Sequence, residues 1–162
     1  MIGTTTISIT RDELLNRMDH GWTMFEALVA RVPAAQFGAP TSSGWALGSM
    51  LAHVAAWHDE TTHRLYRYMA TGHQQPPPNE GDASDDAYNA RVVDETRDRT
   101  PDQILHSLRR SYARLRGAVA ELGAELDDEG WVSAIVGGNS YAHYEEHQPE
   151  VEAAIDQSAG RR

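Results

Sequence analysis

Six apolar residues between positions 105 and 122 recur at intervals of three and four, and this spacing leaves few folds open to the chain. The interval places all six on one face of an α-helix; they are Leu105, Leu108, Tyr112, Leu115, Val119 and Leu122. Thr100 precedes the run as a helix cap, with Pro101 at the first helical position and Gln103 three residues after the cap. The segment therefore predicts a helix that packs in a bundle.

Two earlier segments carry the same helical periodicity. Thr10 and Glu13 form a capping-box pattern ahead of a helix that we expect from about residue 11 to 32, ended by Pro33. A second apolar pattern predicts a helix from residue 45 to about 70, stopped by a glycine two residues later. Both helices are long enough to span a bundle.

The remaining segments complete an all-α pattern. Three consecutive prolines make residues 73–82 an extended connection, followed by a polar segment over 84–99 that we interpret as a short helix. We expect residues 124–138 to form an acidic loop followed by a short apolar stretch that covers one end of the core. The last helix is expected to begin near Asn139, with Asn139 or Ser140 as its cap, and to be interrupted at Pro149.

No segment shows the alternation typical of strands, so the fold class is predicted to be all-α. The long connection lies between the second and third main helices of the resulting four-helix bundle. With 162 residues, the chain suits one domain over 1–162, with loosely held termini at 1–9 and 158–162.

The charge balance bears on partners and location. Asp and Glu number 24 against 14 basic residues, all of them Arg, which gives a formal net charge of −10. We expect so acidic a surface to repel phosphate backbones and anionic lipids, which argues against nucleic acid and membranes as partners. The N-terminus resembles no signal peptide, and no apolar run approaches a membrane span, so we expect a cytoplasmic protein. The absence of cysteine means that thiol chemistry needs an external thiol.

Three histidines are candidate metal ligands. His143 and His147 lie four residues apart near the predicted start of the last helix, so both imidazoles share one face. His53 lies at the edge of the apolar face of the second helix, between Met50 and Trp57, and is the best candidate for a third ligand. The alternative is a metal-free bundle in which these histidines are solvated or hydrogen-bonded at the rim of the core.

The segments around these histidines resemble a known family. Residues 45–60 (WALGSMLAHVAAWHDE) followed far downstream by 138–147 (GNSYAHYEEH) are similar to the DinB-like superfamily. The nearest branch contains the N-terminal domains of mycothiol-dependent maleylpyruvate isomerases, and the resemblance covers about residues 10–157. It implies a four-helix bundle, with a homodimer possible. It also implies a divalent metal, commonly zinc or nickel, held by His53, His143 and His147.

Several other side chains are candidates for the chemistry around a metal. Glu60 is nearly in line with His53 on the second helix and is the candidate for an acid or base, although an exposed surface acid is the plainer interpretation. Arg64 follows on the same line and either receives an anionic substrate or pairs with Glu60. Met50, Trp57, Arg64 and Tyr144 are the predicted substrate pocket. His58 is predicted to face solvent or the rim of the core rather than a metal.

Two classes of function remain open. In the first, a metal-dependent enzyme uses an external low-molecular-weight thiol, such as mycothiol or bacillithiol, to transfer sulfur to an electrophilic small molecule or to isomerise it. In the second, a binding or self-resistance protein sequesters a reactive metabolite or hydrolyses it with metal-bound water.

Overall fold

The computed structural model describes residues 9–77, 82–126 and 130–160. Over these ranges the chain forms six α-helices and one short 3-10 helix, and it contains no strand. The elements are α1 (Arg11–Val29), η1 (Ala34–Gln36), α2 (Leu47–Ala70), α3 (Asp85–Thr96), α4 (Pro101–Ala120), α5 (Trp131–Gly138) and α6 (Tyr141–Ala159). The predicted all-α class is confirmed.

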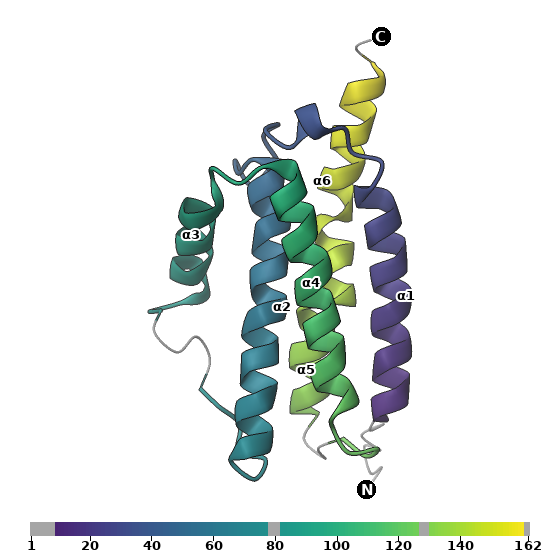
Figure 1. The fold of residues 1–162 in the computed structure, drawn as a ribbon, viewed down its shortest axis with the longest axis vertical. Helices are drawn as coiled ribbons and strands as arrows, with labels where there is room; N and C mark the ends of the chain where they lie inside the picture. Colours follow the sequence, from purple (N-terminus) through teal and green to yellow (C-terminus); the bar gives the residue numbers. More distant parts are fainter. Residues whose placement is uncertain (1–8, 78–81, 127–129, 161–162) are drawn as a thin grey trace, which may run out of the picture.

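Four of these helices, α1, α2, α4 and α6, form a bundle (Figure 1). α1 packs against α4 and α6, and α2 packs against the same two helices, so α1 and α2 occupy opposite corners. Because α2 and α4 run in the same direction, the chain must return along the bundle between them, and α3 lies within that connection (Figure 1). No helix in the described part of the chain is long and apolar enough to cross a membrane.

The side-chain caps predicted for α1 and α4 are present. Thr10 and Glu13 form a capping box at the start of α1, and Thr100 and Gln103 form another at the start of α4. The helix ends are less well predicted, since α1 stops at Val29, three residues early, and α2 starts two residues late.

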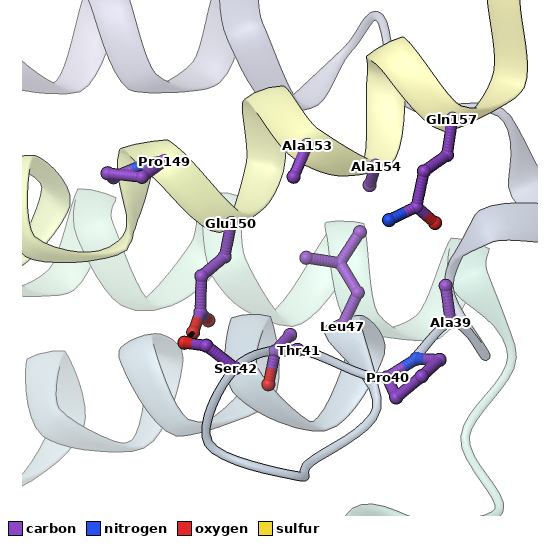
Figure 2. A pocket seen from close by; sticks show the side chains of 10 residues that line it. All are labelled: Ala39, Pro40, Thr41, Ser42, Leu47, Pro149, Glu150, Ala153, Ala154 and Gln157. Atoms are coloured by element: carbon purple, nitrogen blue, oxygen red, sulfur yellow. Dashed lines mark hydrogen bonds between the residues drawn. The ribbon is translucent and has the colours of Figure 1, made fainter. Parts of the chain in front are cut away.

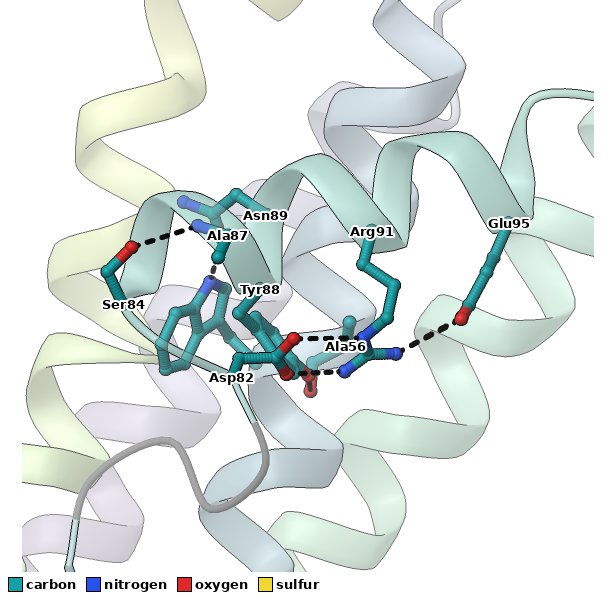
Figure 3. Close-up of polar contacts among 9 residues, drawn as sticks. Ala56, Asp82, Ser84, Ala87, Tyr88, Asn89, Arg91 and Glu95 are labelled. Atoms are coloured by element: carbon teal, nitrogen blue, oxygen red, sulfur yellow. Dashed lines mark hydrogen bonds and ion pairs between the residues drawn. The ribbon is translucent and has the colours of Figure 1, made fainter.

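The helix α3 packs on the outer side of α2 (Figure 3). Tyr88 donates a hydrogen bond to the carbonyl oxygen of Ala56 at 2.9 Å, and Trp57 Nε1 donates to Asn89 Oδ1 at 2.9 Å. Arg91 bridges Asp82 and Glu95 on the exposed side of α3. These contacts bring Asn89 close to the part of α2 that carries His53.

The predicted interruption at Pro149 is wrong, because α6 runs without a break from Tyr141 to Ala159. Proline removes one backbone donor from a helix, but here Val151 and Ala154 on the far side of Pro149 are buried and hold the second half against the bundle. Ser140, one of the two predicted caps, does occupy the N-cap position of α6, but its hydroxyl donates to the carbonyl oxygen of Val136 and caps no amide of the helix. The predicted apolar stretch forms α5, which packs against α6.

Gly21 lets α1 approach the start of α6 closely. A methyl group on Gly21 would lie 2.7 Å from Tyr141 Cβ and 3.2 Å from Tyr141 Cα. The backbone of α1 or α6 would have to move to relieve this overlap. We expect Gly21→Ala to lower the free energy of unfolding by about 1–3 kcal/mol in urea denaturation. The control is Gly117→Ala on α4, where a methyl group meets no described atom within 4 Å. It should raise stability by about 0.5–1 kcal/mol, and equal stability of both variants would contradict the close approach.

Candidate metal centre

Two neighbouring helices bring the three predicted histidines together. His53 lies in the second turn of α2, and His143 and His147 lie in the first two turns of α6. The Nε2 atoms of His53 and His143 are 3.0 Å apart, and those of His143 and His147 are 3.1 Å apart. One nitrogen from each of the three rings lies within 4.8 Å of the others.

This spacing is close to what one metal ion requires. Two ligands of a tetrahedral zinc site, each about 2.1 Å from the ion, are about 3.4 Å apart. His53 and His143 are 5 % and 7 % exposed, so little water reaches the ring nitrogens that would bind an ion. Three imidazole nitrogens are a donor set that suits zinc or nickel. The residues present therefore fit a divalent ion of this kind.

The three rings are neutral near pH 7. Burial together with the nearby His147 lowers the pKa of His53 to about 4, although Asn89 partly opposes this. Burial together with the neighbouring histidines lowers the pKa of His143 to about 3. Burial also lowers the pKa of His147, although Glu146 and Glu150 partly oppose this. A neutral imidazole keeps the lone pair that a metal needs, so no proton has to be displaced at pH 7.

The Nδ1 atoms of the rings differ in their surroundings. Those of His53 and His143 are buried and have no hydrogen-bond partner among the described residues. His147 Nδ1 instead lies 3.9 Å from a carboxylate oxygen of Glu150. Of the three histidines, only His147 therefore has a carboxylate oxygen within 4 Å among the described residues.

Aromatic rings enclose the centre on the side of α2. The Trp45 and Trp57 rings lie 5.2 Å and 6.4 Å from the His53 ring, measured between centroids. Asn89 lies beside His53 and holds Trp57 in place. Neither Trp45 nor Asn89 was predicted to lie beside the centre, since Trp45 was interpreted only as the start of the second helix and Asn89 lies on a different segment.

The family described as the mycothiol maleylpyruvate isomerase N-terminal domain matches residues 18–159. The chain belongs to this family. The resemblance inferred from the two histidine motifs is thereby confirmed. No curated protein is significantly similar in sequence to this member of the family.

Solved structures show the same fold at low sequence identity. One is a variant of mycothiol-dependent maleylpyruvate isomerase, with a TM-score of 0.68 and 20 % identity over 88 % of this chain and 61 % of the isomerase. An uncharacterised protein from Escherichia coli UTI89 gives a TM-score of 0.77 at 10 % identity, over 93 % of this chain and 95 % of that one. The colibactin self-resistance protein ClbS gives 0.75 at 12 % identity, over 94 % and 96 %.

The expected exclusion of nucleic acid is wrong. ClbS, which shares the fold, was crystallised in complex with double-stranded DNA. The physical reason is that net charge is a sum over the whole surface and does not describe one face of it. In this member of the isomerase-domain family, four arginines and two acids line one cavity between α2, α3 and α4, although the chain carries a net charge of −10. Arg91 and Arg114 pair with Glu95 and Asp59 there, and the other two arginines are Arg99 and Arg110.

The predicted pocket residues lie in different environments. Trp57 is 8 % exposed and flanks the centre, as described above. Met50 is fully buried, and Tyr144 is 3 % exposed and stacks on Phe25 at 4.8 Å. A substrate could reach either of these two side chains only if the core opened, so neither lines an open pocket in this structure.

Glu60 and Arg64 are placed near α3 and α5, farther along α2. The Arg64 guanidinium lies over the Trp131 ring at 5.5 Å, and its Nε is buried without a hydrogen-bond partner among the described residues. Burial lowers the pKa of Arg64, and Glu60 and Asp85 partly oppose this. The predicted Glu60–Arg64 ion pair does not form within 4 Å in the described structure, and the acid–base role of Glu60 stays a prediction.

The prediction for His58 is wrong in its burial. His58 is fully buried rather than solvated, and it lies between α4 and α6. Its Nδ1 is 3.0 Å from Ser111 Oγ, and its Nε2 is 2.7 Å from the Tyr144 hydroxyl. Because Ser111 Oγ donates to the carbonyl oxygen of Leu108, it accepts from His58 Nδ1–H, and Tyr144 donates to Nε2. The position in the sequence gave no sign of these partners, which come from two distant helices.

Proposed function

We propose that the protein is a divalent-metal-dependent enzyme that uses an external thiol to act on an electrophilic small molecule, by S-transfer or isomerisation. The observation that supports this most directly is the convergence of three neutral histidine rings, two of them buried and the third 14 % exposed, with Nε2 atoms 3.0 Å and 3.1 Å apart. Membership of the family described by mycothiol and maleylpyruvate isomerase supports the same class of chemistry.

His53, His143 and His147 would hold the ion through Nε2. A divalent ion bound there supplies a Lewis acid that deprotonates a coordinated thiol and polarises a carbonyl group. Trp45 and Trp57 limit the access of water on the α2 side, which favours attack by a thiolate over hydrolysis.

The thiol must come from outside the chain, because the sequence contains no cysteine. Addition of a thiolate to an activated carbon–carbon double bond breaks the π bond and leaves its electron pair as an enolate. Return of the thiol's proton to the enolate carbon gives a conjugate, which is the product of S-transfer. Rotation about the former double bond followed by loss of the thiolate from the enolate re-forms the double bond and gives an isomer. Both reactions therefore begin with the same step, and the substrate decides between them.

A second candidate is capture or hydrolysis of a reactive metabolite without a thiol. The fold shared with the self-resistance protein ClbS supports this alternative. The same three histidines would serve it, with water in place of the thiol.

The test is to incubate metal-loaded protein with a panel of electrophiles, with and without mycothiol, bacillithiol or glutathione, and to follow products by mass spectrometry. We expect thiol-dependent products that disappear in His53→Ala and persist in His106→Ala, which alters an exposed histidine of α4. Water-addition products formed without any thiol would support the hydrolase instead. Tight retention of an unchanged ligand would support a binding protein.

A further inference from the structure

Glu150 lies between His147 and the loop that precedes α2, and Figure 2 shows its carboxylate next to Ser42 of that loop. Its Oε2 is 3.9 Å from His147 Nδ1, and its Oε1 accepts a hydrogen bond from the Ser42 hydroxyl. The pair stands at one end of a cavity of ≈ 240 Å³ between that loop and α6. Glu150 thus connects a candidate ligand to a segment more than 100 residues away in sequence.

The loop that carries Ser42 has a defined conformation. Gly44 N–H donates to the Thr41 carbonyl at 3.0 Å and closes a turn, in which Gly44 has a φ of 85°. Thr41 donates to the Trp45 carbonyl through its amide at 2.7 Å and its hydroxyl at 2.9 Å. Because the Trp45 ring packs near His53, the same loop contacts both sides of the metal centre.

Glu150 has an oxygen free to act on His147. Its Oε2 is buried and has no hydrogen-bond partner within the described ranges. The side chains of His147 and Glu150 are each 14 % exposed, so water screens the pair only weakly. Glu150 follows His147 by three residues on α6, the interval at which helical side chains are neighbours.

An imidazole whose Nδ1 carries the proton presents the lone pair of Nε2. A carboxylate that faces Nδ1 favours this tautomer and orients the ring, as the partners of metal-binding histidines commonly do. In this protein the Nε2 of His147 is the atom that faces His143, at 3.1 Å.

We propose that Glu150, held by Ser42, is a positioning residue that keeps His147 protonated on Nδ1 and directs its Nε2 lone pair into the three-histidine centre. The part of this inference that concerns metal affinity rests on the proposed function. The part that concerns the His147 tautomer does not, since it follows from contacts within the protein.

The experiment compares wild type with Glu150→Ala, Glu150→Gln and Ser42→Ala. Long-range ¹⁵N–¹H correlation spectra of the metal-free proteins at pH 7.5 report which ring nitrogen of His147 carries the proton. Competition between the protein and a chelator for Zn²⁺ gives the affinity, and Co²⁺ absorption spectra report the geometry. The control is Glu145→Ala, which removes the same charge from an exposed position of α6.

We expect Glu150→Ala to lose the Nδ1–H preference of His147 and to bind Zn²⁺ about 10–100-fold more weakly. Glu150→Gln should restore part of the preference, because its amide oxygen keeps a partial negative charge facing Nδ1 but lacks the full charge of the carboxylate. Ser42→Ala should show a smaller loss than Glu150→Ala, and Glu145→Ala should match wild type.

The two levels of the inference fail separately. If wild type binds Zn²⁺ and Glu150→Ala keeps the wild-type tautomer and affinity, the role of Glu150 is refuted and the proposed function stands. If wild type takes up no metal, the proposed function fails, and the spectra of the metal-free proteins alone decide whether Glu150 orients His147.

Discussion

Replacing His143 by alanine should weaken binding of a divalent metal by at least about a hundredfold. His143 is the central member of the cluster, since its Nε2 lies 3.0 Å from that of His53 and 3.1 Å from that of His147. Without His143, only His53 and His147 remain as candidate ligands, and two ligands do not hold a divalent ion tightly. We expect wild type to hold one Zn²⁺ or Ni²⁺ per chain in elemental analysis and the variant to hold none after dialysis against a weak chelator.

The matched control is His63→Ala, which removes an exposed imidazole from α2. It should leave the stoichiometry and affinity of wild type unchanged. Thermal unfolding adds a second readout, because a ligand that binds the native state raises its stability with concentration. Zn²⁺ should therefore raise the melting temperature of wild type and of His63→Ala but not that of His143→Ala. Metal retention by His143→Ala at wild-type affinity would refute the three-histidine site.

The middle of each main helix could be predicted from sequence because local chemistry determines it. The caps at Thr10 and Thr100 act within three residues, and apolar periodicity reports burial directly. The start of α2 could not be predicted in this way. Its first amides donate to the carbonyl oxygens of Ala39 and Phe37 at 2.9 Å and 2.8 Å, partners that exist only once η1 has packed against the bundle.

The same distinction applies to the site. His143 and His147 are four residues apart, so helical geometry alone places them together, and His53 was identified by its place beside an apolar face. Ser42 and Asn89 lie on other segments, and their contacts with Glu150 and Trp57 depend on how those segments dock. Periodicity carries no information about such contacts, so neither residue was predicted.

His58 is a fully buried polar side chain whose burial was not predicted from the sequence, and His58→Ala should lower the free energy of unfolding by about 3–5 kcal/mol. The change leaves a cavity at a fully buried position. It also leaves the Tyr144 hydroxyl and Ser111 without their histidine partner. Urea denaturation of the metal-free proteins measures the loss. Tyr144→Phe and Ser111→Ala should each cost less, about 1–2 kcal/mol, since each breaks one hydrogen bond.

The stability due to His58 should also depend on pH. Burial lowers the pKa of His58 from 6.5 to about 3. Below pH 6.5 the unfolded chain binds a proton at this position that the folded protein does not bind, so acidification favours unfolding until the pH approaches 3. The contribution is therefore fully present above pH 6.5 and is lost progressively as the pH falls from 6.5 towards 3.

Replacing His58 by glutamine, which cannot titrate, should remove this part of the pH dependence. We expect the free energy of unfolding of His58→Gln to fall less steeply than that of wild type between pH 6.5 and pH 4. His63→Ala serves as the control, because it removes an exposed histidine of the same helix and should keep the wild-type slope. Identical slopes for wild type and His58→Gln would show that His58 is not held neutral by burial, and the hydrogen bonds from Tyr144 and to Ser111 would then need another assignment of protons.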